Sequence, residues 1–489
     1  MSNESKEYDL VIIGGGPAGI VGAATAKACG KTVALVDCHR ALGGAGVNTG
    51  TVPSKTLRET ALALSGVNAR RLTGVELSLK QETTVGDFLR HEQDVREGFN
   101  TMISQQLRAD KADVYVGTGA FVDPHTVRVS RAPGRPGPVT AGGVTEDILL
   151  RGENVLIATG SSPLHPAVFP FGSPEIYDSD TILKLDRLPA RLAVVGAGVI
   201  GSEYACTFAI LGTEVHLIDG RDVLLPFLDA ELSQALTAAM KREGVVFHQK
   251  VEVQQCHPRG AAGVRLLLSS RATLTVDAVL VAAGRRSNTD KLNLPAAGVA
   301  VGERGLISVD KHFRTNVPHI YAAGDVIGFP ALASTSMEQA RRAVDHALAP
   351  EREPRMSPLL PNGIYTIPEV SMVGATEEAL KQQGVGYVVG RARYWDNARG
   401  RIIGDAVGFL KLLFRREDMK LLGVHIMGEQ ATEIVHIGLL AMLAEATAEV
   451  FVEACFNAPT LGGLYKSATM DAMLQASGAR ASLTAFAEA

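Results

Sequence analysis

Two glycine-rich segments of this chain have the residue types and the spacing that hold a dinucleotide. The first reads Gly-Gly-Gly-Pro-Ala-Gly from Gly14 to Gly19, and Asp37 follows about 20 residues later. Its glycines allow a tight turn, a close approach of the backbone to a pyrophosphate and close packing of a helix on a strand. The pyrophosphate would lie at the helix N-terminus, where unpaired N–H groups and the helix dipole stabilise negative charge. The predicted contacts are Gly14, Gly16, Pro17, Ala18, Gly19 and Asp37.

The same pattern recurs in the middle of the chain. Gly196-Ala-Gly-Val-Ile-Gly201 follows another apolar run, and Asp219 stands at the same offset from its last glycine as Asp37 does in the first copy. The predicted contacts of this second segment are Gly196, Gly198, Val199, Ile200, Gly201 and Asp219. A chain with two complete fingerprints is expected to bind two dinucleotides in separate domains and to move electrons between them.

The acid of the second copy has a basic neighbour, which makes its preference between nucleotides ambiguous. Asp219 suits the ribose of NAD and would repel a 2′-phosphate. Arg221, two residues further on, could offer that phosphate a fork of charged donors. The pocket is therefore predicted to accept both NAD(H) and NADP(H), while a solvated loop arginine without this role remains the alternative.

The elements that must position these residues are short apolar strands followed by helices. A strand is expected over residues 9–13, a helix over 20–30 and a second strand over 32–36. The second copy repeats this order, with strands over 192–195 and 215–218. The alternation predicts an α/β fold with two Rossmann-like dinucleotide-binding domains. A chain of 489 residues has room for two to four domains in all.

Composition narrows the class of protein. The hydrophobic content of 46% and the charged content of 20% are typical of a globular enzyme, and the net charge of −4 gives no electrostatic reason to expect nucleic acid or a membrane surface as a partner. The polar start has no signal-peptide pattern, and no apolar run is long enough to span a membrane. Five scattered cysteines without CxxC or zinc-like spacing predict a reducing cytoplasm and no metal site: Cys29, Cys38, Cys206, Cys256 and Cys455.

Further segments extend the pattern into a family resemblance. Residues 43–55, 155–160, 282–289 and 320–325, together with both fingerprints, resemble the pyridine nucleotide-disulfide oxidoreductases, such as dihydrolipoamide dehydrogenase and glutathione reductase. The resemblance covers about residues 8–475. It implies FAD in the first Rossmann-like domain, NAD(P) in the second, a C-terminal α+β dimerisation domain and a homodimer. It adds to the FAD contacts Gly44, Thr51, Lys55, Thr159, Gly160, Gly324 and Asp325, and to the NAD(P) contacts Gly284.

These motifs imply a division of the chain into four stretches. The FAD-binding domain is expected at 1–160, the NAD(P)-binding domain at 161–284, the rest of the FAD-binding or central domain at 285–350 and the interface domain at 351–489. A surface hairpin is expected over about 131–147 and a proline-rich linker over 350–361, because proline and glycine interrupt regular structure.

The chain departs from the disulfide reductases at the positions that handle thiols. Gly46 and Thr51 stand where that family has its two redox cysteines. Ala458 and Gly463 stand where it has a histidine base and the glutamate that orients it. Because both halves of the dithiol machinery are missing together, the resemblance implies a different electron acceptor.

The residues that face the flavin are retained. In the family, a lysine at the position of Lys55 contacts the flavin N5 edge and pairs with a glutamate at the position of Glu203. A nearby ammonium stabilises the negative charge that arrives with a hydride, and its carboxylate partner keeps it from being a lone buried charge. Lys55 and Glu203 are therefore the predicted catalytic pair, whereas His165, His425 and His436 are assigned no role.

Three functions fit these features. Residues 51–55 and 456–460 are similar to segments of the soluble, Si-specific pyridine nucleotide transhydrogenases, apart from Ala458. That similarity implies FAD-dependent hydride transfer between NADPH and NAD+, ping-pong through flavin N5 at one nucleotide site. The first alternative is an NAD(P)H dehydrogenase, or diaphorase, that reduces quinones in the space beside Gly46 and Thr51. The second is a non-enzymatic flavin-binding scaffold or sensor, against which the retained Lys55 and Glu203 count.

Overall fold

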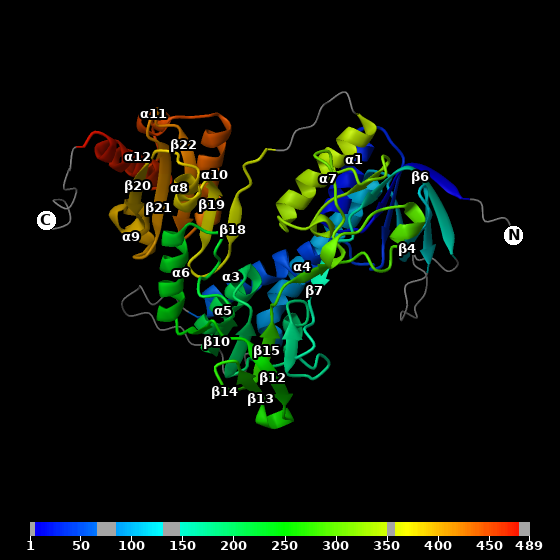
Figure 1. Ribbon diagram of the computed structural model, residues 1–489, viewed down its shortest axis with the longest axis horizontal. Helices are drawn as coiled ribbons and strands as arrows, with labels where there is room; N and C mark the ends of the chain where they lie inside the picture. Colours follow the sequence, from blue (N-terminus) through cyan, green and yellow to red (C-terminus); the bar gives the residue numbers. More distant parts are fainter. Residues whose placement is uncertain (1–4, 66–84, 131–146, 350–356, 479–489) are drawn as a thin grey trace.

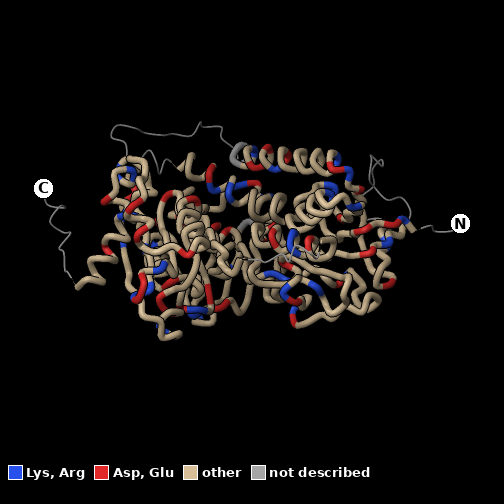
Figure 2. The backbone as a smooth tube through the Cα atoms, turned by 90° about the horizontal axis from the view of Figure 1, so that it is seen from above, with Lys and Arg blue, Asp and Glu red and all other residues tan. Residues whose placement is uncertain are grey.

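The computed structural model describes residues 5–65, 85–130, 147–349 and 357–478. Figure 1 shows the first body, which holds α1 (Pro17–Ala28) and α7 (Ala333–Leu348), side by side with the third, C-terminal body, and the second body, which holds β9 (Arg191–Val195) to β15 (Ala278–Val281), below them. The expected hairpin over 131–147 and linker over 350–361 lie mostly outside the described residues, as does the stretch from 479 to the end. Acidic and basic residues are interspersed along the tube in Figure 2.

The first body is built on a seven-stranded sheet. Five of its strands run parallel: β3 (Asp113–Val116), β2 (Val33–Asp37), β1 (Lys6–Ile13), β6 (Ile148–Ile157) and β17 (Ile320–Ala322). Antiparallel strands β4 (Thr118–Asp123) and β5 (Thr126–Ser130) extend β6. The longer helices of this body are α1 (Pro17–Ala28), α3 (Thr51–Leu64), α4 (Val85–Ala109) and α7 (Ala333–Leu348). The short helix α2 (Gly44–Asn48) precedes α3.

The turn between β1 and α1 depends on glycine. Gly14 has a φ of 112°, which disfavours any side chain, and a Cβ at Gly19 would collide with the carbonyl oxygen of Gly14. Helix α1 begins at Pro17 rather than at the expected Ile20, because proline presets the backbone angle needed at the first helical position. The glycine fingerprint therefore brings the helix N-terminus close to the carboxyl end of β1.

The second body repeats this arrangement. Its five-stranded parallel sheet has the order β11 (Val246–Gln249), β10 (Glu214–Asp219), β9 (Arg191–Val195), β15 (Ala278–Val281) and β8 (Ile176–Asp178). Helix α5 (Val199–Ile210) follows the second glycine turn, and α6 (Ala230–Arg242) follows β10. A separate antiparallel sheet is formed by β12 (Val253–Pro258), β13 (Val264–Leu268) and β14 (Thr273–Val276). The parallel order confirms a Rossmann-like sheet.

The chain enters and leaves the second body through one two-stranded ribbon. Strand β7 (Ser161–Pro163) pairs antiparallel with β16 (Arg285–Ser287). After β16 the chain returns to the first sheet, where β17 pairs with β6 and α7 packs on α1. Segments on either side of the second body therefore meet in the first, close to the glycine turn of residues 14–19.

The C-terminal body has the predicted α+β composition. Its antiparallel sheet has the order β18 (Asn362–Ile364), β19 (Val370–Gly374), β22 (Leu421–Met427), β21 (Phe409–Arg415) and β20 (Tyr387–Arg393). Its helices are α8 (Glu377–Gln382), α9 (Ala398–Ile403), α10 (Ala431–Leu443), α11 (Ala448–Glu453) and α12 (Gly463–Ala476). Among the described residues, no helix combines the length and apolar character needed to cross a membrane.

Candidate functional site

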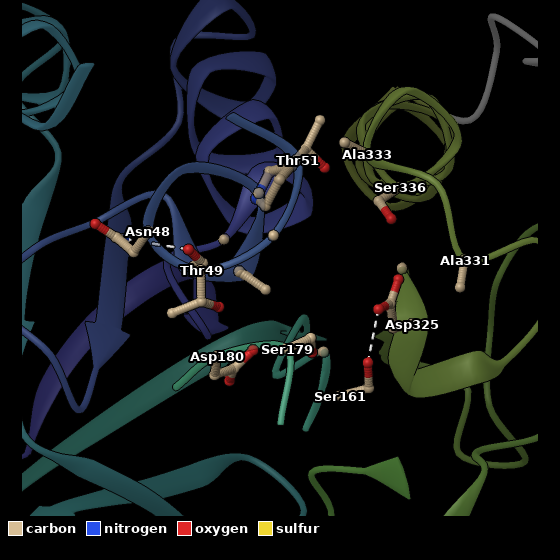
Figure 3. Close-up of a pocket in the computed structure, with 18 of the residues that line it drawn as sticks. Asn48, Thr49, Thr51, Ser161, Ser179, Asp180, Asp325, Ala331, Ala333 and Ser336 are labelled. Atoms are coloured by element: carbon tan, nitrogen blue, oxygen red, sulfur yellow. Dashed lines mark hydrogen bonds between the residues drawn. The ribbon is translucent and has the colours of Figure 1, made fainter. Parts of the chain in front are cut away.

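A cavity of about 1590 Å³ lies where the three bodies meet. Its walls come from the β1–α1 turn, from residues 44–55 and from the segment around Asp325 in the first body. Helix α5 contributes from the second body, and the β18–β19 region contributes from the third. In Figure 3, Asn48, Thr49, Ser179 and Asp180 lie on one side of this space, across from Asp325 and Ser336. Tertiary packing therefore joins segments from the whole chain around one cavity.

The cavity contains most of the residues that the sequence singled out. They are Gly14, Gly16, Pro17, Ala18, Asp37, Gly44, Gly46, Thr51, Lys55, Thr159, Gly160, Val199, Ile200, Glu203, Gly324 and Asp325. Seven others lie outside its lining: Gly19, Gly196, Gly198, Gly201, Asp219, Arg221 and Gly284. Gly19 packs against the turn of its own motif, and the second fingerprint reaches the cavity through Val199, Ile200 and Glu203.

The first glycine turn is shaped to hold a dinucleotide phosphate. The backbone N–H of Gly15 donates to Asp37 Oδ2 at 2.6 Å, which fixes the acid against the turn. Helix α1 starts without a side-chain cap from the described residues, so its first N–H groups remain available to an anion. Thr159 Oγ1 is buried and has no hydrogen-bond partner within the described part of the chain. The uncapped helix, the unpaired hydroxyl and the glycine-lined space fit a bound FAD.

Asp325 is held by two residues from the ribbon that joins the first two bodies. Ser161 Oγ donates to Asp325 Oδ2 at 2.7 Å, the bond drawn in Figure 3. Arg285 Nε donates to Ser161 Oγ at 2.7 Å and lies 3.9 Å from Asp325 Oδ2. Gly324, with a φ of 81°, turns the chain before Asp325, and its N–H donates to Gln339 at 2.9 Å. The carboxylate of Asp325 is thus fixed at the edge of the cavity.

The predicted catalytic pair is formed. Lys55 Nζ lies 2.6 Å from Glu203 Oε2, joining α3 of the first body to α5 of the second. The Glu203 side chain is 7% exposed and that of Lys55 is 25% exposed, and both residues line the cavity. Burial strengthens the attraction within such a pair. The arrangement places one fixed positive charge at the wall of the cavity.

The third body contributes Tyr365 to this pair. Lys55 Nζ lies 4.9 Å from the centre of the Tyr365 ring, within the range of a cation–π contact. The backbone N–H of Tyr365 donates to Glu203 Oε1 at 2.9 Å, so both carboxylate oxygens of Glu203 are engaged. No local motif marks Tyr365 in the sequence, and it was not predicted as a site residue.

Helix α3 is tied to the segment that carries Tyr365. Arg58, one helical turn after Lys55, is 5% exposed, and its Nε donates to the Thr366 carbonyl at 3.2 Å. Its Nη2 lies 3.3 Å from Glu369 Oε1. Glu369 Oε2 in turn accepts from Thr432 Oγ1 at 2.9 Å. This buried network fixes α3, and hence Lys55, relative to the C-terminal body.

Two of the positions that differ from the disulfide reductases, Gly46 and Thr51, lie in the cavity wall, and Gly46 is closely packed. A Cβ at Gly46 would lie 2.7 Å from Pro17 Cγ, so the backbone here packs directly on the start of α1. Thr51 begins α3 and lines the cavity. Ala458 is exposed, and Gly463 begins α12. None of the five cysteines, all within the described residues, forms a disulfide.

Asp219, the acid of the second glycine fingerprint, makes the same backbone contact as Asp37 and also forms an ion pair. The N–H of Ala197 donates to Asp219 Oδ2 at 2.6 Å, matching the Gly15–Asp37 bond. Arg221 donates to both carboxylate oxygens of Asp219, with Nε–Oδ1 at 2.8 Å and Nη2–Oδ2 at 2.7 Å. Burial disfavours the ionised acid, but the bonds from Arg221 and Ala197 outweigh it and hold the pKa of Asp219 below its usual range. Arg221 therefore has a carboxylate partner in this structure.

The three histidines without an assigned role differ in their surroundings. His165 Nε2 lies 2.7 Å from Asp178 Oδ2, and the His165 ring stacks on Phe171. His425 is fully buried, and its Nε2 contacts the Ala375 carbonyl at 2.9 Å. His436 lines the cavity wall formed by α10. The Asp178 partner of His165 was not foreseen from the sequence.

Comparisons with known proteins agree over nearly the whole length. Residues 8–347 match the family described as pyridine nucleotide-disulphide oxidoreductase, and residues 360–469 match its dimerisation domain. The chain is similar to the soluble pyridine nucleotide transhydrogenase of Mycobacterium bovis, at 46% identity over 468 residues that cover 96% of this chain and 97% of the relative. The protein of the same name from Pseudomonas fluorescens is 41% identical over 476 residues, covering 95% and 98%.

Solved structures give the same overall match. LpdA from Mycobacterium tuberculosis superposes with a TM-score of 0.85 at 26% identity, covering 95% of this chain and 99% of that one. The HOCl-induced flavoprotein disulfide reductase RclA from Escherichia coli, in its Cu(II) complex, superposes with a TM-score of 0.84 at 27% identity and the same coverage. The bodies seen here are thus arranged as in these two structures.

Proposed function

Because this chain belongs to the pyridine nucleotide-disulphide oxidoreductase family, we propose that its three bodies serve hydride transfer between NADPH and NAD+. It is a flavoprotein oxidoreductase that acts on NAD(P)H, as are the transhydrogenases that it resembles at 41–46% identity. Bound FAD supplies the hydride carrier between the two nicotinamide nucleotides. We assign the cavity between the bodies to FAD and the second glycine turn to the nicotinamide nucleotides.

One observation carries this function: Lys55 and Glu203 form an ion pair at 2.6 Å in the cavity. The same cavity has Gly46 and Thr51 where the disulfide reductases have their two redox cysteines. A buried carboxylate and a fixed ammonium are costly to maintain without a use, because each loses hydration. The pair supports acceptance of a hydride, and the missing thiols leave no internal group to take the electrons onward. The electrons must therefore leave with a second diffusible molecule.

The proposed roles of the residues follow from their contacts. Lys55 stabilises the negative charge that develops at the cavity wall during hydride transfer. Glu203 holds the ammonium of Lys55, and Tyr365 packs its ring against it. Asp325 and Asp37, held by Ser161 and the Gly15 amide, bind the cofactor from the cavity wall. Because one nucleotide site serves donor and acceptor in turn, ping-pong kinetics are expected.

The function is tested by mixing the FAD-loaded protein with NADPH and a thio-NAD+ analogue under anaerobic conditions without quinone. Formation of reduced thio-NAD at a rate comparable to flavin reduction is the expected result. Flavin reduction without transfer would contradict the proposal and point to an oxidant such as a quinone. Absence of flavin reduction would point to a binding protein. The absorbance of thio-NADH distinguishes its formation from oxidation of NADPH.

The nucleotide pocket gives a separate prediction. Replacing Arg221 with Ala is expected to weaken NADPH binding about tenfold or more, because charge-assisted bonds to a phosphate contribute about 1.5–3 kcal/mol. NADH binding should change little, since its ribose offers no phosphate to a guanidinium. Dissociation constants of both nucleotides for the oxidised enzyme measure the effect. Equal losses for the two nucleotides would show that Arg221 only supports the loop.

We further propose that the chain acts as a homodimer in the cytoplasm. The C-terminal body matches a dimerisation domain, and several large apolar side chains on its helices are exposed: Ile402, Leu440, Leu443, Val450, Met470 and Met473. Exposed apolar side chains on a body that matches a dimerisation domain support an interface with another copy. The absence of disulfides among the five cysteines is compatible with a reducing compartment.

A further inference from the structure

Two adjacent loops at the edge of the second body each carry a cation paired with an acid. The first loop follows β10 and contains Arg221, which is bound to Asp219. The second follows β11 and contains Lys250, whose Nζ lies 3.1 Å from Asp222 Oδ2. Lys250 was not among the residues that the sequence singled out, because it stands about 30 positions beyond the second fingerprint's acid.

The backbone holds these two loops together. Strands β10 and β11 are parallel neighbours, and their register places Asp219 beside Gln249. The N–H of Lys250 donates to the Arg221 carbonyl at 3.1 Å, and that of Val251 donates to the Asp219 carbonyl at 3.1 Å. Lys250 adopts a φ of 56°, uncommon for a residue with a side chain, at the point where β11 ends. Both cations are therefore fixed to the same edge of the sheet.

The charges around these loops nearly balance. Arg221 and Lys250 face the carboxylates of Asp219 and Asp222, and Glu252 lies close to the backbone of Gly220. With three acids and two cations, the region has no excess positive charge to attract a phosphate from a distance. Any preference for a phosphorylated ribose must then come from direct contacts made by the two cations.

The two ion pairs differ in exposure, since the side chains of Arg221 and Asp219 are 49% and 12% exposed. The side chains of Lys250 and Asp222 are 70% and 61% exposed, and exposed ion pairs of this kind contribute only about 0–1 kcal/mol. A phosphate monoester carries almost two negative charges at neutral pH and accepts several charge-assisted hydrogen bonds. A cation such as Lys250 therefore gains when a phosphate replaces its carboxylate partner. When no phosphate is present, the cation returns to its carboxylate and is not left unpaired.

Resting on the proposed function, in which one site serves both nucleotides, we propose that Lys250 acts with Arg221 as a second specificity-determining cation for the 2′-phosphate of NADP(H). With NADP(H) bound, Lys250 leaves Asp222 and Arg221 leaves Asp219, and both cations bind the phosphate. With NAD(H) bound, each cation stays with its own acid. Exchange of partners lets one pocket accept either nucleotide with Lys250 and Arg221 each paired to an anion in both states, while Asp219 keeps its bond from the Ala197 N–H.

The test compares two ligands that differ only in this phosphate, adenosine 2′,5′-bisphosphate and 5′-AMP, by calorimetric titration of the FAD-loaded protein. Lys250→Met is expected to weaken the bisphosphate about tenfold and to change 5′-AMP less than about twofold. Asp222→Asn is expected to tighten the bisphosphate, because Lys250 then has no carboxylate to leave. Lys241→Met is the matched control: it removes the same charge from α6, near the opposite end of β11, and should alter neither ligand.

Three outcomes would overturn the proposal. They are an unchanged affinity for the bisphosphate in Lys250→Met, an equal loss for both ligands in that variant, and weaker bisphosphate binding in Asp222→Asn. These measurements need no turnover. A protein that reduces its flavin but fails to pass a hydride to thio-NAD+ would refute the transhydrogenase function while leaving discrimination between the two adenosine ligands intact. The two failures are therefore distinguishable.

Discussion

Replacing Lys55 with Met is expected to slow reduction of the bound flavin by NADPH by about 100-fold or more. A positive charge or hydrogen-bond donor that is already positioned where negative charge develops raises the reaction rate about 10²–10³-fold, because it does not have to reorganise during the reaction. Lys55 meets that requirement: Glu203 at 2.6 Å and the Tyr365 ring at 4.9 Å hold its ammonium in place. Anaerobic stopped-flow measurement of flavin bleaching gives the rate directly.

Two further variants separate electrostatics from damage to the fold. Lys31→Met, in the same body, removes an exposed lysine that pairs with Asp9 at 3.1 Å, and flavin reduction should be unaffected. Tyr365→Leu removes the ring contact but keeps the backbone bond to Glu203, so a smaller loss than that of Lys55→Met is expected. A Lys55→Met protein that retains FAD and reduces it at the wild-type rate would remove the proposed role of the lysine.

The second large effect is expected on stability, from Lys411. This side chain is 1% exposed in β21, and its Nζ contacts three carboxylates: Asp229 at 2.7 Å, Glu231 at 3.0 Å and Glu377 at 2.5 Å. Asp229 and Glu231 belong to the second body at the start of α6, whereas Lys411 and Glu377 belong to the third. Figure 1 shows α6 rising toward the C-terminal sheet at this point.

Lys411→Met is expected to destabilise this junction by about 3–5 kcal/mol, because it leaves buried carboxylates without their shared partner. Hydrogen exchange of the α6 and β21 amides should report an opening free energy lower by that amount. Lys381→Met is the matched control, since Lys381 pairs with Glu377 at 3.5 Å but is 63% exposed, and a loss below about 1 kcal/mol is expected. Protection unchanged in Lys411→Met would show that the junction does not depend on this ion network.

The same cluster predicts a pH dependence. Burial disfavours the ionised forms of Asp229, Glu231 and Glu377, but their ion pairs outweigh it, so the pKa of each carboxyl is lowered. A lowered pKa in the folded state stabilises the protein above the unfolded pKa, and this contribution is lost as the pH falls. The stability difference between the wild type and Lys411→Met should therefore be largest near neutral pH and shrink below about pH 4. A difference independent of pH would contradict the electrostatic origin.

Features that depend on residues close together in the chain could be predicted from the sequence. Each glycine fingerprint spans six positions, and its geometry follows from local sterics: Gly14 and Gly196 both adopt a positive φ, and Asp37 and Asp219 accept the same type of backbone bond. The fold class followed from the alternation of strands and helices and is confirmed by the parallel sheets. The family was recognised from these motifs and is confirmed by the matches over residues 8–347 and 360–469.

Contacts between residues far apart in the chain became visible in the folded structure. Lys55 and Glu203 lie 148 positions apart, and the resemblance alone paired them, whereas no pattern indicated Tyr365, which is 162 positions from Glu203. Nor did any pattern indicate that Lys411 would contact Asp229, 182 positions away, or that Lys250 would stand beside Arg221. Local spacing specifies turns and helix starts through backbone sterics, which act over a few residues. Contacts between bodies depend on how whole surfaces pack, and the type of a single residue does not indicate which distant residue it will contact.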